Sequence, residues 1–156
     1  MNNIFLLSPW CEREYFSPQN SLLYLKYCMA DHGYPSKIID CSHYDAEYDH
    51  VAALIKESEK PIIGVTAYTR ERYHAYRLVR RLKKDIPDSL IVVGGRHFGN
   101  LSEETLFYLP EVDIVVRGEG EITMKEICDV VYKNKKIEDV LGVSFRINGE
   151  IKHNSD

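Results

Sequence analysis

The sequence lacks any long apolar run, and this absence argues against a membrane protein. No stretch of its 156 residues approaches the roughly 20 apolar residues that a transmembrane helix needs. The opening residues Met-Asn-Asn-Ile-Phe-Leu-Leu-Ser-Pro also lack the basic region and long apolar stretch of a secretory signal. We therefore expect a cytoplasmic protein with no membrane partner.

Concentrated positive charge is missing as well. The formal net charge is −4, whereas affinity for nucleic acid depends largely on a cationic surface. A nucleic-acid partner is therefore not expected, which leaves small molecules and proteins. Apolar residues make up 44% and charged residues 28% of the chain, the balance of an ordinary folded domain.

Several motifs that carry chemistry are absent. The cysteines Cys11, Cys28, Cys41 and Cys128 show no C-x-x-C spacing, so they predict reduced thiols rather than a zinc or iron–sulfur site. The chain has no Gly-x-Gly-x-x-Gly turn and no Gly-Lys-Ser/Thr ending, which weakens nucleotide and flavin hypotheses. No nucleophile and base can be assembled, so we expect no catalysis by this chain alone.

Short runs rich in Ile, Val and Leu alternate with longer amphipathic segments, a pattern typical of βαβ units. The predicted strands are residues 4–7, 37–40, 62–66, 90–93 and 113–116. The predicted helices are residues 21–32, 46–59, 71–85, 102–108 and 121–134. The pattern predicts an α/β fold with a doubly wound five-stranded parallel sheet in the flavodoxin-like order 2-1-3-4-5.

The end of the chain changes to alternation with period two. Val143, Phe145 and Ile147 alternate with polar residues before Asn148-Gly149, a strong signal for a β-hairpin. We therefore expect a Rossmann-type domain over residues 1–141, with a hairpin and the start of a linker over residues 142–156.

Ligands of doubly wound sheets bind beyond the carboxyl ends of the strands, so the loops there are the candidate site. The loop after strand one has two prolines and three large aromatic residues between Ser8 and Pro18, and either a ligand surface or a packed loop fits it. After strand three come small residues and the start of a helix, where Thr69 is equally suited to be a helix cap. The candidates at this loop are Thr66, Ala67, Tyr68, Thr69 and Arg70.

Strands four and five end in glycine-rich loops. Gly94-Gly95-Arg96-His97 offers a backbone that a ligand can approach closely, although a tight turn is the alternative. His97 is a candidate metal ligand, a proton carrier or a simple hydrogen-bonding residue. The helix dipole alone explains glutamates at the start of a helix. It does not explain the alternating glycines, which a plain helix start does not need. The candidates after strand five are Gly118, Glu119, Gly120 and Glu121.

The third predicted helix carries a basic stripe. Arg77, Arg80, Arg81 and Lys84 recur at i, i+3, i+4 and i+7. Such a stripe is either a solvated helix face or a docking surface for an acidic partner.

Taken in order, these loops resemble the amino-terminal cobalamin-binding domain of cobalamin-dependent radical-SAM enzymes. The resemblance covers nearly the whole chain and is strongest in the Gly-Gly with its nearby histidine and in the Arg-Gly-Glu-Gly-Glu run. Other similar segments are His32-Gly33-Tyr34, Ile38-Ile39-Asp40, Ile63-Gly64-Val65-Thr66 and Gly142-Val143-Ser144-Phe145-Arg146.

The resemblance implies that the loop starting at Thr66 contacts the corrin or its nucleotide tail, and that Gly94 and Gly95 let the tail pass close to the backbone. No Asp-x-His-x-x-Gly follows strand one, so cobalt is expected to lack a histidine ligand and to be covered by Tyr68, Thr69 or Arg70. The family's [4Fe–4S] cluster and S-adenosylmethionine belong to a radical-SAM barrel domain whose C-x-x-x-C-x-x-C motif is not in this chain.

Two interpretations follow besides a flavin- or nucleotide-binding protein, which the missing phosphate loops disfavour. The first is a domain that carries cobalamin for methyl transfer by the barrel domain. In this interpretation the chain is an excised amino-terminal domain or a stand-alone descendant, and we favour excision. The second is a cofactor-less protein-interaction module that docks through the basic stripe.

Overall fold

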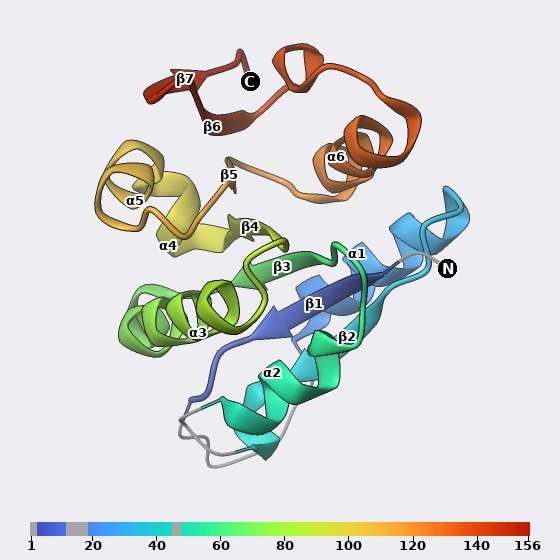
Figure 1. Cartoon of the computed structure of the whole chain (residues 1–156). Coiled ribbons are helices and arrows are strands. Elements are labelled where there is room, and N and C mark those ends of the chain that lie inside the picture. Colours follow the sequence, from blue (N-terminus) through green and yellow to red (C-terminus); the bar gives the residue numbers. More distant parts are fainter. Residues whose placement is uncertain (1–2, 12–18, 45–47) are drawn as a thin grey trace.

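A mostly parallel sheet forms the centre of the computed structural model, which describes residues 3–11, 19–44 and 48–156. In this described part the sheet has seven strands in the order β2-β1-β3-β4-β5-β6-β7 (Figure 1). Strands β1 to β5 are parallel, and β6 and β7 are antiparallel additions beside β5. The strands are β1 Ile4–Ser8, β2 Lys37–Asp40, β3 Ile62–Thr66, β4 Leu90–Gly94, β5 Ile114–Val116, β6 Val143–Ile147 and β7 Glu150–His153.

The helices cover both faces of this sheet. Side chains from α1 and α6 pack on one face, and those from α2, α3, α4 and α5 pack on the other. The α-helices are α1 Asn20–Asp31, α2 Asp49–Lys56, α3 Arg72–Asp85, α4 Gly95–Asn100, α5 Ser102–Tyr108 and α6 Glu121–Lys133. The 3-10 turns are η1 Cys41–His43, η2 Thr69–Glu71 and η3 Ile137–Asp139.

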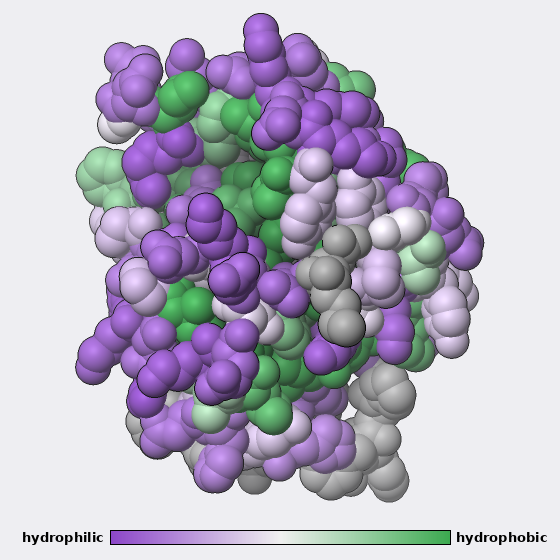
Figure 2. Space-filling view, turned by 45° about the vertical axis from the view of Figure 1, so that its right-hand side comes forward, coloured by the Kyte–Doolittle hydropathy of each residue, from purple (hydrophilic) through white to green (hydrophobic). Residues whose placement is uncertain are grey.

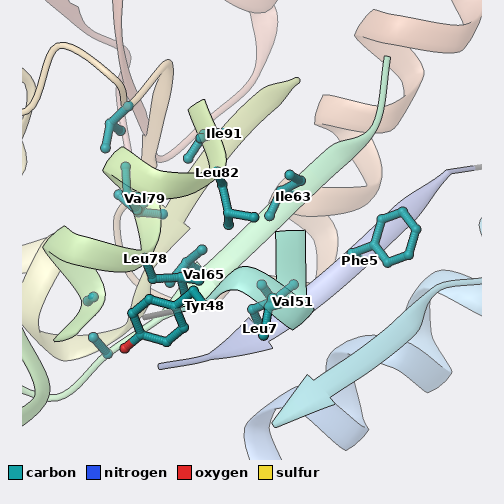
Figure 3. Close-up of a cluster of buried hydrophobic side chains, with 14 of the residues drawn as sticks. Phe5, Leu7, Tyr48, Val51, Ile63, Val65, Leu78, Val79, Leu82 and Ile91 are labelled. Atoms are coloured by element: carbon teal, nitrogen blue, oxygen red, sulfur yellow. The ribbon is translucent and has the colours of Figure 1, made fainter. Parts of the chain in front are cut away.

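Alternation along the strands divides the core into two layers. Phe5 and Leu7 of β1 point toward α2 and α3 together with Ile63 and Val65 of β3 (Figure 3). The alternate residues of the same strands, such as Leu6, face α1 and α6. Because successive side chains in a strand point to opposite faces, a strand buried on both sides is apolar throughout.

The predicted fold class and the order of the five parallel strands are confirmed, while the sheet has seven strands rather than five and two local details differ. Gly95–Asn100 forms the helix α4, whereas the sequence predicts a loop there because glycine-rich sequence is not typical of helices. The described part of the second predicted helix is shorter than residues 46–59 and ends at Lys56, before Lys60 takes a positive φ of 43°.

The predicted hairpin is present and belongs to the main sheet. Asn148 and Gly149 have φ values of 52° and 83°, as a type I′ turn requires. Strand β6 pairs with β5, so β7 runs back toward the end of the sheet where the parallel strands finish. We call this end the carboxyl end of the sheet.

The outer surface is mostly polar on the face shown in Figure 2, where apolar residues are visible in smaller areas between polar ones. None of the helices formed within residues 3–11, 19–44 and 48–156 combines the length and the apolar composition of a membrane-spanning segment.

A buried carboxylate ties α6 to the loop after α1. The side chain of Asp129 is 1% exposed and accepts a 2.5 Å hydrogen bond from the hydroxyl of Tyr34. The ammonium groups of Lys125, Lys133 and Lys135 lie 2.7–2.8 Å from its oxygens. These donors hold the pKa of Asp129 well below its usual range, because each stabilises the ionised form.

We expect Asp129→Asn to lower the free energy of unfolding at pH 7 by about 2 kcal/mol, because it leaves lysines and a buried amide poorly matched. Since the folded-state pKa of Asp129 is depressed, its stabilisation is fully present above the unfolded pKa of about 3.9 and declines progressively as the pH falls from there toward the folded-state pKa, so the difference between the two proteins is smaller at pH 3. Urea unfolding at pH 7 and pH 3 measures both effects. The exposed Asp88→Asn is the control, and equal losses in the two variants would contradict the prediction.

Candidate functional site

A cavity of about 150 Å³ opens at the carboxyl end of the sheet, on the face covered by α1 and α6. We call it the carboxyl-end cavity. From the sheet it is lined by Leu6, Gly64, Val65, Thr66, Val92, Val93, Gly94 and Val116. From loops and helices it is lined by Ser21, Leu22, Leu25, Gly95, Gly118, Glu119, Gly120, Glu121 and Met124.

Two glycines that lack a side chain make room for this cavity. Gly64 lies in the middle of β3, and a Cβ there would come within 3.1 Å of Leu6 Cδ2 and 3.6 Å of Met124 Cε. A Cβ on Gly94 would lie 3.6 Å from Val116 Cβ, an ordinary contact. Neither glycine has a positive φ in this structure. Their backbone conformation therefore does not require glycine, and the absence of side-chain volume is what they contribute.

Gly95, in contrast, is required by the chain itself. Its φ is +82°, and a Cβ would meet Thr66 Oγ1 at 2.5 Å. The neighbouring Ala67 is buried and bonds to the same junction, since its amide donates to the Gly94 carbonyl at 3.4 Å and its carbonyl accepts from the His97 amide at 3.2 Å. The double glycine therefore combines a tight structural junction with an open cavity wall.

The loop between β5 and α6 forms another wall. Gly118, with a φ of +74°, and Gly120 both line the cavity, and a Cβ on either would have no neighbour within 4 Å. Glu119 and Glu121 lie beside them, at the amino terminus of α6. The first backbone N–H groups of a helix have no partner within the helix, so the mouth offers hydrogen-bond donors as well as acceptors.

The loop after β3 stands at the same end of the sheet without lining the cavity. Tyr68 is 49% exposed, and its amide donates to Glu71 Oε2 at 3.0 Å. Thr69 and Arg70 are exposed in the 3-10 turn that follows. Glu71 is itself buried, so it fixes the start of this loop while the three side chains before it stay accessible.

Arg96 and His97 do not line the cavity. The ring of His97 is buried against α3, where its Nε2 lies 2.6 Å from the hydroxyl of Tyr76. Burial, together with the nearby Arg72, lowers the pKa of His97. A neutral histidine bonded to a tyrosine on the other face of the sheet fits the hydrogen-bonding alternative for this residue.

The described residues contain no group of three or more His, Cys, Asp or Glu side chains placed to hold a metal ion. Burial raises the pKa of the Cys128 thiol to about 12 and also raises that of Cys41. Both thiols are therefore protonated at neutral pH and are poor nucleophiles.

The basic stripe on α3 is partly neutralised within the chain. Arg81 pairs with Asp49 and, at 2.7 Å, with Asp85, while Arg80 lies 3.9 Å from Glu111. These ion pairs weaken its case as a docking surface for an acidic partner.

The sequence patterns missed part of the lining. Ser21, Leu22 and Leu25 of α1 and Met124 of α6 enclose the cavity, although in the sequence they belong only to predicted helices. The available signal was Gly64, since a glycine inside a buried strand often marks a close approach by a ligand or another backbone. The aromatic loop predicted between Ser8 and Pro18 lies largely outside the described residues, at 12–18.

The chain matches the B12-binding domain family over residues 12–128 and belongs to that family. An uncharacterized methyltransferase of Pyrococcus horikoshii is 36% identical over 117 residues, which are 75% of this chain and 26% of that protein. The anaerobic magnesium-protoporphyrin IX monomethyl ester cyclase of Rubrivivax gelatinosus is 32% identical over 117 residues, 72% of this chain and 21% of that protein.

Solved structures share the fold over nearly the whole chain. The radical S-adenosylmethionine methyltransferase TsrM of Kitasatospora setae, with cobalamin and a [4Fe-4S] cluster bound, has a TM-score of 0.86 at 15% identity, covering 99% of this chain and 31% of that one. The cobalamin-dependent radical enzyme OxsB, with aqua-cobalamin and S-adenosylmethionine bound, has a TM-score of 0.83 at 22% identity, covering 99% and 22%. The chain thus spans about a fifth to a third of these relatives.

Proposed function

We propose that this cytoplasmic chain binds cobalamin in the carboxyl-end cavity and holds it for a catalytic domain. The observation that carries the proposal is the cavity itself, which stays open because Gly64 and Gly94 contribute no side chains. A cofactor-less interaction module has no need of such a space, and its wall would be free to acquire larger residues. Family membership supports the same ligand.

The size and lining of the cavity fit the nucleotide tail of the cofactor. Apolar cavities of roughly 150 Å³ accept groups the size of benzene, so an aromatic base can enter while the corrin ring stays outside. Leu22, Leu25 and Met124 would pack against the base. Thr66, Ser21 and the glycine loop from Gly118 would offer hydrogen bonds nearer the mouth.

The corrin would then lie over the loops at the carboxyl end. Tyr68, Thr69 and Arg70 are accessible there and are our candidates for covering the lower face of the ring. His97 is buried and bonded to Tyr76, which supports a cobalt without a histidine ligand from this residue. The chemistry that a corrinoid supplies is methyl-group transfer, whereas this chain binds and orients the cofactor.

Catalysis would come from a further domain. The curated relatives and the solved neighbours are several times longer than this chain. We infer a radical-SAM barrel partner, bearing the [4Fe–4S] cluster and S-adenosylmethionine, that transfers the methyl group. In this arrangement residues 1–141 form the cofactor domain, and residues 142–156 its hairpin and the start of the connection.

Incubation with hydroxocobalamin followed by gel filtration tests the proposal. We expect a corrinoid absorbance spectrum that elutes with the protein at about one equivalent, since the cavity is a single site. Incubation with flavin mononucleotide under the same conditions should leave no retained yellow chromophore. Retention of flavin but not of corrinoid would overturn the proposed function.

A further inference from the structure

Three segments that are far apart in the sequence are hydrogen-bonded together beside the carboxyl-end cavity. They are the loop that starts at Arg117, the turn at Gly142 before β6, and residues 154–156 after β7. The amide of Arg117 donates to the carbonyl of Gly142 at 2.8 Å, and the amide of Gly142 donates to the carbonyl of Ser155 at 2.8 Å. The end of the described chain is therefore joined to the loop that lines the cavity.

The guanidinium of Arg117 adds side-chain contacts to residues 154–156 and to β6. One of its terminal nitrogens donates to the carbonyl of Asn154 and lies 2.7 Å from Asp156 Oδ1, while the other lies 3.4 Å from Ser144 Oγ. The Arg117 side chain is only 19% exposed. A charge-assisted hydrogen bond in a partly buried place is stronger than an ordinary one, so this side chain restrains the segment firmly.

Asn154 extends the restraint to the turn η3. Its side-chain amide donates to the carbonyls of Ile137 at 2.8 Å and Val140 at 2.7 Å. Its backbone amide also donates to the carbonyl of Val143 at 3.0 Å. Asn154 therefore bonds to the backbone at η3 and at β6 in addition to the Arg117 side chain.

The Gly118–Gly120 loop depends for its position on the contacts that Arg117 makes with Gly142 and residues 154–156. A Cβ on Gly118 or Gly120 would have no neighbour within 4 Å, so the chain does not pack tightly around these residues. The hydroxyl of Thr123 lies 3.5 Å from the carbonyls of both Glu119 and Leu141, a weak link to the turn before β6. Glycines have wide backbone freedom, so a loop containing two of them needs restraint from outside.

We propose that Arg117 and residues 154–156 form a latch that positions the Gly118–Gly120 loop for cobalamin. Arg117 is a positioning residue in this latch, because its side chain holds the C-terminal segment and its backbone begins the loop. The inference rests on the proposed function and deepens it. By thermodynamic linkage, displacing residues 154–156 weakens cobalamin binding, and bound cobalamin protects residues 154–156 from opening.

The contacts of the latch contribute unequally to the restraint because they differ in burial. Asp156 is 84% exposed, so its ion pair with Arg117 contributes little. The bond from Arg117 to the Asn154 carbonyl and the two bonds from the Asn154 amide are part-buried and carry the restraint. Asp156→Asn is therefore the matched control within the same cluster.

The experiment measures hydroxocobalamin affinity of the full chain by absorbance titration and, separately, hydrogen exchange without ligand. We expect Arg117→Gln to raise Kd about tenfold and Asn154→Ala several-fold in the same direction, with Asp156→Asn within about twofold. Arg117→Gln should also speed amide exchange at Gly142 and Asn154, whose amides donate to the carbonyls of Ser155 and Val143. Val79→Ala, in the core on the opposite face, should lower Tm without changing Kd.

Three outcomes would overturn the latch. They are an unchanged Kd in Arg117→Gln while the unmodified chain binds cobalamin, an equal rise in Kd in Val79→Ala, and unchanged amide exchange at Gly142 and Asn154 in Arg117→Gln. If the unmodified chain binds no cobalamin, the proposed function fails, and faster exchange at Gly142 and Asn154 in Arg117→Gln would then show restraint without a cofactor role.

Discussion

Gly94→Leu should abolish cobalamin retention while leaving the fold intact. Gly94 has extended backbone with a φ of −158°, which any residue adopts, so a side chain causes no backbone strain. A Cβ there would make only ordinary contact with Val116, and the rest of a leucine would occupy the carboxyl-end cavity. We expect Kd for hydroxocobalamin to rise by at least about a hundredfold, because the ligand and the side chain compete for the same space.

A graded series separates blocking from general damage. Gly94→Ala adds one methyl group and should weaken binding much less than Gly94→Leu. Lys56→Leu places the same side chain at the exposed end of α2 and serves as the surface control. Thermal unfolding should give a similar Tm for all these proteins, and binding by Gly94→Leu at the unmodified affinity would show that the cavity is not the cofactor site.

Gly95→Ala should instead destabilise the protein. The φ of +82° is unfavourable for alanine, and the new methyl group would meet Thr66 Oγ1 at 2.5 Å and the backbone of Ala67 at 3.2–3.3 Å. The two penalties together predict a loss of about 3 kcal/mol in the free energy of unfolding. For a chain of this length, that loss lowers Tm by about 10 °C.

A double-mutant cycle with Thr66→Ala tests the origin of this loss. Removing the hydroxyl relieves the contact but not the backbone strain, so we expect Gly95→Ala to cost about 1 kcal/mol less in the Thr66→Ala background. Urea unfolding of the four proteins measures the coupling. Strict additivity of the two substitutions would show that the contact with Thr66 contributes nothing.

The double glycine shows what the sequence can and cannot predict. The sequence pattern predicts that Gly94 and Gly95 lie at the end of a strand, and therefore at the ligand end of a doubly wound sheet. Only the structure separates their roles, because Gly94 has ordinary backbone beside a cavity and Gly95 has a positive φ beside Thr66. A sequence pattern cannot distinguish a glycine that makes room from a glycine that makes a turn.

The candidate residues divide in the same way. Thr66, Gly94, Gly95 and the run Gly118-Glu119-Gly120-Glu121 line the cavity, as their place at strand ends predicts. Ala67, Tyr68, Thr69, Arg70, Arg96 and His97 do not line it. Arg96 and His97 follow Gly95 into α4, and the direction of that helix carries the ring of His97 to Tyr76 on the other face.

Hydrophobic periodicity and turn residues are local properties, so the sequence predicts the fold class, the strand order and the loops that meet at the carboxyl end. The faces that enclose a cavity, and the segments that hold its wall, follow from the tertiary structure. Met124 reaches the cavity, and Arg117 reaches residues 154–156, only through packing between elements that are distant in the chain. Such contacts depend on how the sheet and helices come together, which no local pattern specifies.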